Sequence, residues 1–221
     1  MVTDLQIARR NLWLLSEFSA LFVLIPCYFY FHATRWNIHA ALWIVTAYVL
    51  FWMKRTPDFS WPELWHGSGW AKRARNIALL RFLFSTLLII GLTILLVPER
   101  LFSFPLQRPI LWLAVMLLYP ILSALPQEIL FRSYFFRRYG NLFPQPWPMI
   151  AASAISFGFA HIVFHNWVSP LLCLIGGIMF AYSYTQHRSL KWAAIEHAAY
   201  GCMVFTIGIG VYFLVNGWKP S

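Results

Sequence analysis

Several ionisable side chains lie inside long apolar stretches of the chain, where they are costly to bury. An ionisable group within a bilayer costs at least about 2.5–3.5 kcal/mol on insertion scales, so each one calls for a reason. Glu128 and Arg132 stand four residues apart, which places them on one helical face with the acid first. His161 and His197 lie in two later apolar stretches. A carboxylate and imidazoles of this kind can act as general acids or bases and as hydrogen-bond donors.

The composition shows what kind of scaffold must position these groups. Of the 221 residues, 60% are hydrophobic and 11% are charged, against roughly 25% charged in an ordinary soluble domain. A soluble enzyme is excluded because there is too little polar surface, and disorder is excluded because the chain can bury ample apolar surface. The apolar runs are continuous rather than alternating, which disfavours a β-barrel. The remaining class is a polytopic α-helical membrane protein.

Seven apolar segments are long enough to cross about 30 Å of hydrocarbon at ~1.5 Å per residue. We therefore predict an all-α fold in which residues 1–221 form one integral membrane domain. About seven transmembrane helices would surround a polar cavity that opens toward the cytoplasm. Residues 1–109 would supply three spans and an amphipathic loop, and residues 110–215 would form the core that bears the ionisable groups. The predicted spans are 12–31, 38–53, 77–97, 110–131, 149–164, 168–186 and 191–215.

The charge distribution predicts the orientation of these spans. The chain has 17 Lys and Arg residues against 7 Asp and Glu residues, and the basic ones cluster between apolar runs. This pattern favours contact with anionic lipid over binding of nucleic acid, and it predicts a cytoplasmic N-terminus. Twelve basic residues fall on the predicted cytoplasmic side and four on the other: Arg9, Arg10, Lys54, Arg55, Lys72, Arg73, Arg75, Arg81, Arg137, Arg138, Arg188 and Lys191 against Arg35, Arg100, Arg108 and Lys219. The connection 54–76 interleaves basic residues with Trp61, Trp65 and Trp70, which is typical of a segment at the headgroups.

Three short motifs in the second half of the chain resemble those of one family. The run Gln-Glu-Ile-Leu-Phe-Arg at 127–132 resembles an EExxxR motif, and Phe-Gly-Phe-Ala-His at 157–161 resembles FxxxH. The run His-Ala-Ala-Tyr-Gly at 197–201 is similar to HxxxN without its Asn. In this order the motifs resemble those of the CPBP family, which includes type II CAAX prenyl endopeptidases and bacteriocin-processing or immunity proteins, also called Abi. The resemblance covers about residues 110–205.

The resemblance implies a bundle of transmembrane helices around a hydrophilic cavity, in the inner membrane of a bacterium. It implies glutamate-dependent endoproteolysis of a membrane-anchored or prenylated protein or peptide, by water attack without a covalent intermediate or a cofactor. It assigns the catalytic positions to Gln127 (base), Glu128 (its neighbour), Arg132, His161 (water orientation) and His197 (oxyanion donor), and substrate contact to Phe157 and to Gly201 at the position of the missing Asn.

The amide of Gln127 cannot accept and return a proton near neutral pH, which leaves three explanations open. The first is that Gln127 replaces a Glu by an isosteric substitution that inactivates an enzyme. The second is that Glu128 or His161 serves as the base instead, which for Glu128 requires a distorted helix, and Pro126 makes such a distortion reasonable. Alternatively the protein is a catalytically inactive scaffold or immunity protein that binds a membrane partner.

Zinc is a minor alternative to metal-free chemistry. His161 and His165 stand at i and i+4, a spacing that suits a metal, and His197 could be a third ligand. Against zinc, His165 is expected at the membrane boundary, away from the other groups, and no HExxH motif occurs. We therefore predict no cofactor.

Three further features have structural interpretations. We expect Glu17 to hydrogen-bond a neighbouring helix. Glu196 points about 100° away from His197, so it is expected to pair with Lys191 or Arg188. The glycines at 176–177 permit close helix approach.

Overall fold

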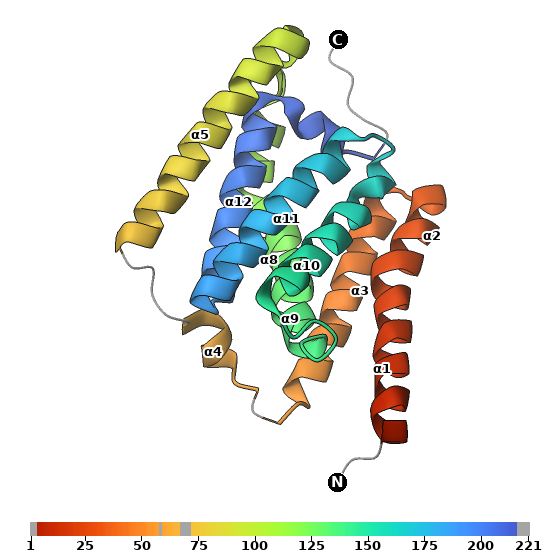
Figure 1. Cartoon of the computed structure of the whole chain (residues 1–221). Coiled ribbons are helices and arrows are strands. Elements are labelled where there is room, and N and C mark those ends of the chain that lie inside the picture. Colours follow the sequence, from red (N-terminus) through yellow and green to blue (C-terminus); the bar gives the residue numbers. More distant parts are fainter. Residues whose placement is uncertain (1–3, 58, 67–71, 216–221) are drawn as a thin grey trace.

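The computed structural model describes residues 4–57, 59–66 and 72–215, and every regular element among them is helical (Figure 1). The predicted all-α fold is therefore confirmed. Trp70 and Lys219, used above for orientation and interface, lie outside the described residues. The elements are α1 (Asp4–Ser19), η1 (Ala20–Leu24), α2 (Ile25–His32), α3 (Arg35–Lys54), α4 (Trp61–His66), α5 (Lys72–Leu96), η2 (Pro98–Arg100), α6 (Ser103–Gln107), α7 (Pro109–Tyr119), η3 (Pro120–Ala124), α8 (Leu125–Glu128), η4 (Ile129–Tyr134), α9 (Phe135–Arg138), α10 (Pro146–Ala160), η5 (His161–Phe164), α11 (Val168–His187), α12 (Leu190–Ile207) and η6 (Ile209–Phe213).

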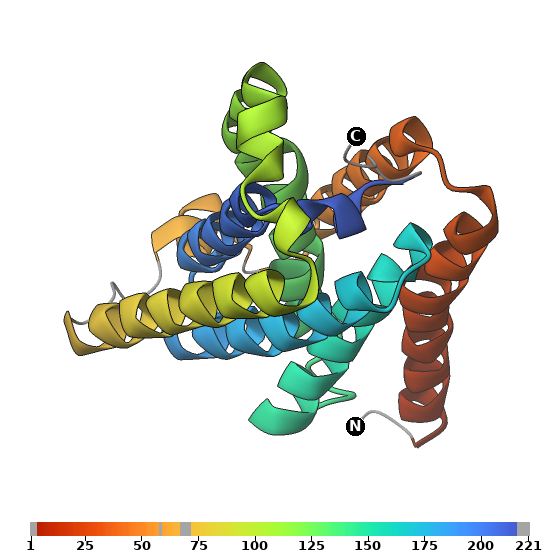
Figure 2. The ribbon, with the colours of Figure 1, turned by 90° about the horizontal axis from the view of Figure 1, so that it is seen from above.

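Six helices in the described ranges are long and apolar enough to cross a membrane, and they correspond to the first six predicted spans. The seventh prediction falls on α12, whose Lys191, Glu196 and His197 lower its hydropathy. This helix packs against α5, α7 and α11 inside the bundle, while α1 and α5 lie at opposite margins (Figures 1 and 2). The protein is thus an integral membrane bundle in which α12, a helix with three ionisable residues, lies inside. The six spans are Leu5–His32, Trp36–Lys54, Ala74–Leu96, Pro109–Arg138, Pro146–Phe164 and Val168–His187.

The helix α12 ends at Ile207, earlier than the predicted end at 215. Gly208 follows with a φ of 112°, a conformation that residues with a Cβ rarely adopt. A Cβ at this position would lie 1.8 Å from the carbonyl oxygen of Arg100. The chain therefore turns where α12 meets the segment before α6, and the Phe102 N–H donates to the Ile207 carbonyl oxygen at 2.9 Å.

The fourth span is a continuous rod of 30 residues from Pro109 to Arg138, about 45 Å long at 1.5 Å per residue. Two π-helical segments, Pro120–Ala124 and Ile129–Tyr134, interrupt its α-helical hydrogen bonding. Pro120 opens the first, and Pro126 stands two residues after its end. Proline removes a backbone donor, which loosens the regular ladder. The distortion that we predicted beside Pro126 is present, and the rod extends seven residues beyond the predicted end at 131.

The helices α10 and α11 form a tightly packed antiparallel pair that carries one of the motif histidines at its end. A Cβ at Gly177 would lie 3.0 Å from the Cα of Ala154, and one at Gly158 would lie 3.0 Å from the Pro170 carbonyl oxygen. The predicted close approach at Gly177 is therefore confirmed.

This contact predicts a difference between two glycines that both lie in membrane spans. Gly177→Ala should lower the free energy of unfolding by about 1–3 kcal/mol, because the added methyl overpacks the contact with Ala154. Gly91→Ala on α5 serves as the matched control, since nothing lies within 4 Å of its Cβ position. It should leave stability unchanged or raise it by about 1 kcal/mol through helix propensity. Thermal unfolding of the purified variants in one detergent measures both, and equal stabilities would contradict the packing argument.

At the other end of the rod, Glu17 of α1 is bound by three side chains. Arg138 holds it bidentately, with Nε donating to Oε1 at 2.8 Å and Nη2 to Oε2 at 2.6 Å. Tyr139 donates to Oε1 at 3.1 Å, and Tyr134 donates to the same oxygen. The expectation that Glu17 bonds a neighbouring helix is confirmed, and the cluster anchors α1 to the rod.

Candidate active site

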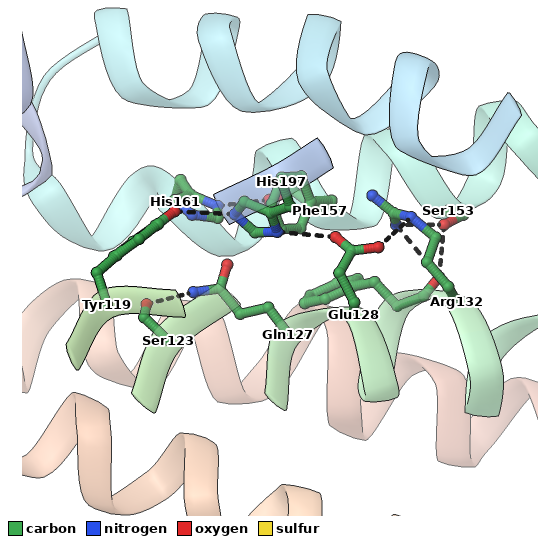
Figure 3. Close-up of polar contacts among 10 residues, drawn as sticks. Tyr119, Ser123, Gln127, Glu128, Arg132, Ser153, Phe157, His161 and His197 are labelled. Carbon is green, nitrogen blue, oxygen red and sulfur yellow. Dashed lines mark hydrogen bonds and ion pairs between the residues drawn. The ribbon is translucent and has the colours of Figure 1, made fainter. Parts of the chain in front are cut away.

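Glu128 lies at the centre of a buried polar network and is fully buried (Figure 3). The Nε of Arg132 lies 3.1 Å from its Oε2, one helical turn along the rod. The Nδ1 of His197, on α12, lies 2.8 Å from its Oε1. The predicted Glu128–Arg132 pair is therefore present, and it extends to a third group on another helix.

Arg132 is fixed from several sides and is itself fully buried. Its Nη1 donates to the Ser153 Oγ at 2.9 Å, and the Ser153 hydroxyl donates to the Phe131 carbonyl oxygen at 2.7 Å. Its guanidinium also lies 5.1 Å from the centroid of the Phe157 ring, within the range of a cation–π contact. Arg132 therefore holds a rigid positive charge behind Glu128.

His197 has both ring nitrogens in hydrogen bonds. A carboxylate only accepts, so the Nδ1 that faces Glu128 carries a hydrogen. The Nε2 lies 3.0 Å from the Tyr119 hydroxyl. Phe180 stacks on the imidazole, with ring centroids 4.9 Å apart and an interplanar angle of 14°. The ring is thus locked between Glu128 and Tyr119.

His161 stands at the junction of α10 and η5. Its Nδ1 lies 2.7 Å from the Phe157 carbonyl oxygen, which can only accept, so this nitrogen carries a hydrogen. The Nε2 of the neutral ring then has a free lone pair and can take a proton.

Gln127 lies one residue before Glu128, and its amide bonds within the rod. Its Nε2 donates to the Ser123 Oγ at 2.8 Å. Its Oε1 is buried and has no hydrogen-bond partner among the described residues. Because buried polar atoms are normally satisfied, this oxygen is a free acceptor at the site.

These groups meet at a cavity of about 940 Å³ whose wall is mostly apolar. Gln127, His161, His197, Phe157 and Gly201 all contribute to the lining, whereas Glu128 and Arg132 lie behind it. Residues of all six spans and of α12 therefore surround one chamber.

The cavity lies nearer the end of the bundle away from the basic clusters, which differs from the predicted opening toward the cytoplasmic side. The lining residues of α3 fall between Trp36 and Val45, away from Lys54, and α5 contributes Ser85 and Ile89 in its second half. The rod continues to Arg138, so its polar groups lie well before its basic end.

The structure brings together the residues that the resemblance singled out, and it adds Tyr119, Ser123 and Ser153, which sequence reasoning missed. Tyr119, Ser123 and Gln127 stand at i, i+4 and i+8. Residues at this spacing share one helical face with Gln127, which is a sequence signal that could have pointed to Tyr119 and Ser123. Nothing in the sequence pointed to Ser153.

The expected partner of Glu196 is corrected, and the zinc alternative finds no support among the described residues. Glu196 pairs with Arg81 of α5 rather than with Lys191 or Arg188, because α5 packs directly beside α12. The described residues contain no group of three or more His, Cys, Asp or Glu side chains that could hold a metal ion. The ring of His165 lies against Tyr30 instead, at 4.4 Å between centroids.

The fold and this network define a polytopic helical membrane protein with a buried Glu–His–Arg site beside an intramembrane cavity. The family model described as Type II CAAX prenyl endopeptidase Rce1-like matches residues 109–203. This segment of the chain, which contains the whole network around Glu128, is therefore similar to that family, and the resemblance seen in the motifs is confirmed. The search of the curated proteins found no match, and neither did the search of the solved structures.

Proposed function

We propose that the protein is an intramembrane endopeptidase that hydrolyses a peptide bond of a membrane-anchored or prenylated protein or peptide. The observation that carries the proposal is the state of His161, whose Nδ1 bonds to the Phe157 carbonyl oxygen while the residue lines the cavity. A neutral imidazole held in this tautomer offers Nε2 to a water molecule. The mostly apolar wall suits a substrate that enters from the lipid.

In the proposed reaction His161 Nε2 takes a proton from water as the water attacks the carbonyl carbon, and then returns it to the leaving amine. No covalent intermediate forms. Glu128 contacts Arg132 and His197 through its two oxygens and lies behind the cavity wall, so it positions His197 rather than activating water. The free Oε1 of Gln127 accepts a hydrogen bond from the water or from a substrate N–H.

For the cellular setting, we propose the inner membrane of a bacterium, with the N-terminus in the cytoplasm. The twelve-to-four asymmetry of the basic residues supports this orientation. The partners would be the membrane-anchored substrate and anionic lipid at the basic loops. In this orientation the chamber lies toward the non-cytoplasmic half of the bilayer.

A cleavage assay tests the proposal. The purified protein in lipid nanodiscs should release a C-terminal fragment from a peptide that carries a farnesylated cysteine, as detected by mass spectrometry. Gln127→Glu should raise the rate by on the order of 10²-fold, because a carboxylate beside the water adds a second proton acceptor. Ser16→Ala on α1, whose hydroxyl bonds only its own helix at Leu12, is the control and should leave the rate unchanged. If neither the wild-type protein nor Gln127→Glu releases a fragment, the endopeptidase proposal fails.

A second function is favoured by the amide at position 127. Since Gln127 cannot carry the proton, a non-catalytic scaffold or immunity-type protein that holds a membrane partner in the same cavity is the alternative. Binding of the lipidated peptide without cleavage, unchanged by Gln127→Glu, would support this alternative.

A further inference from the structure

The arrangement around His197 leaves it no hydrogen to offer a substrate. Its Nδ1 bonds Glu128 at 2.8 Å and its Nε2 bonds the Tyr119 hydroxyl at 3.0 Å. An imidazole has two nitrogens and hence at most two hydrogen bonds in its plane. The next group along this chain of bonds is the Tyr119 hydroxyl, and Tyr119 belongs to the cavity lining.

Gly201 provides the space that Tyr119 occupies. A Cβ built on Gly201 would lie 2.2 Å from Cε1 of Tyr119, and 2.4 Å from both Cζ and the hydroxyl oxygen. Any side chain at position 201 would therefore collide with the tyrosine. Position 201 stands one turn after His197, on the same face of α12. The ring of Tyr119, from the rod, thus fills the place beside His197 that a side chain of α12 would otherwise take.

The hydroxyl can serve as a donor because it both accepts and donates. When Nε2 of His197 carries a proton, the Tyr119 oxygen accepts it as a hydrogen bond, and the O–H of the tyrosine is free to point elsewhere. Glu128 contacts the opposite edge of the His197 ring, and Arg132 supplies a buried positive charge behind Glu128. The hydroxyl at the end of this chain therefore favours an acceptor that gains negative charge.

We propose that Tyr119 donates the hydrogen bond that stabilises the oxyanion, in place of His197, and that Gly201 is required to admit its ring. The proposal rests on the proposed endopeptidase function. It involves no proton transfer: the O–H hydrogen bond strengthens as the carbonyl oxygen of the scissile peptide becomes an anion. His197 then acts through Tyr119 as a positioning residue.

The kinetic test is Tyr119→Phe, which removes one oxygen and keeps the ring beside Gly201. The kcat for the farnesylated peptide should fall by about 10²–10³-fold, the usual cost of one oxyanion donor, with KM nearly unchanged. Tyr182→Phe on α11, an exposed tyrosine stacked on Trp147, should retain the wild-type kcat. A Tyr119→Phe variant with wild-type kcat would overturn the proposal.

A rescue variant distinguishes the catalytic effect of losing the Tyr119 hydroxyl from an effect on folding. Tyr119→Ala combined with Gly201→Asn restores a hydrogen-bonding side chain beside His197 and removes the collision. We expect this double variant to recover at least tenfold in kcat over Tyr119→Ala alone, on the order of 1.4 kcal/mol. Gly201→Ala should destabilise the protein when Tyr119 is present and not in the Tyr119→Ala background. Equal destabilisation in both backgrounds would contradict the steric argument.

A binding measurement distinguishes failure of this inference from failure of the proposed function. The probe is the farnesylated peptide with a phosphonate in place of the scissile amide, which presents a tetrahedral anion. Tyr119→Phe should weaken its binding by about 10-fold or more, while the affinity for the amide peptide stays the same. If the wild-type protein cleaves nothing but shows this selective loss, the endopeptidase proposal fails and the donor assignment stands. If phosphonate binding is unaffected, the donor assignment fails.

Discussion

Glu128→Ala is expected to lower the free energy of unfolding by about 3–5 kcal/mol, the largest stability effect of any single change that we predict. Among the described residues, the substitution removes the only carboxylate in contact with Arg132, which is fully buried, and also the partner of His197 Nδ1. A buried arginine without a counter-charge retains its desolvation cost and loses its compensation. Thermal or denaturant unfolding in detergent measures the change.

The matched control is Glu99→Ala. Glu99 also stands close to an arginine, with Oε1 4.0 Å from the Nε of Arg100, but its side chain is 64% exposed. Exposed pairs contribute little, so no measurable change is expected. The double variant Glu128→Leu/Arg132→Met should be more stable than Glu128→Ala, because no charge is left without a partner. If Glu128→Ala is as stable as Glu99→Ala, the carboxylate does not neutralise Arg132.

His161→Ala is expected to reduce cleavage of the farnesylated peptide by about 10²–10⁴-fold, the range for removing a general base. The unfolding temperature of this variant should stay close to that of the wild-type protein. The hydrogen bond that is lost joins His161 to the Phe157 carbonyl oxygen, one turn earlier in the same segment. Peptide binding should be retained, so the loss falls on kcat rather than on KM. The assay is the nanodisc cleavage measurement, run alongside a binding titration.

His165→Ala provides the comparison, because His165 lies only four residues later and its ring contacts Tyr30 rather than the cavity. This variant should cleave at the wild-type rate. Turnover that survives His161→Ala would remove His161 from the chemistry and return attention to Glu128 as the base.

The local parts of the site could be predicted from the sequence because helical geometry determines them. Glu128 and Arg132 are neighbours on any regular helix, and Pro126 signalled the distortion of the rod. By contrast, the partner of Glu196 was wrongly predicted from nearby positions. Its partner Arg81 is 115 residues away in sequence, and only the packing of α5 beside α12 brings the two together.

Tyr119 was missed for a related reason. Its position beside His197 depends on the absence of a side chain at Gly201, on a helix that follows much later in the chain. The residue pattern of a single helix does not indicate such a steric match between two helices. Spacing within each helix does not say how three separate helices are rotated about their axes, so the contacts that His161 and His197 make at one cavity came only from the structure.

The sequence predicted which segments are helical better than it predicted the residues at which the helices end. The rod runs to Arg138 rather than 131, because its apolar stretch gives way to basic residues gradually. The last helix stops at Ile207 because Gly208 adopts a positive φ against the Arg100 carbonyl oxygen. Local backbone contacts of this kind are invisible to hydropathy.

The two π-helical segments let the rod absorb a change in its residue count. Hydrogen bonds from i to i+5 close a turn that holds one residue more than an α-helical turn does. Deleting a single residue from Pro120–Ala124 would therefore let an ordinary α-turn form, with the helix still continuous. The side chains beyond the deletion would keep nearly the same directions relative to Tyr119, whereas a deletion within a regular α-helical stretch would turn them by about 100°. Two chains whose rods differ by one residue at this point can thus present the same motif side chains to their chambers.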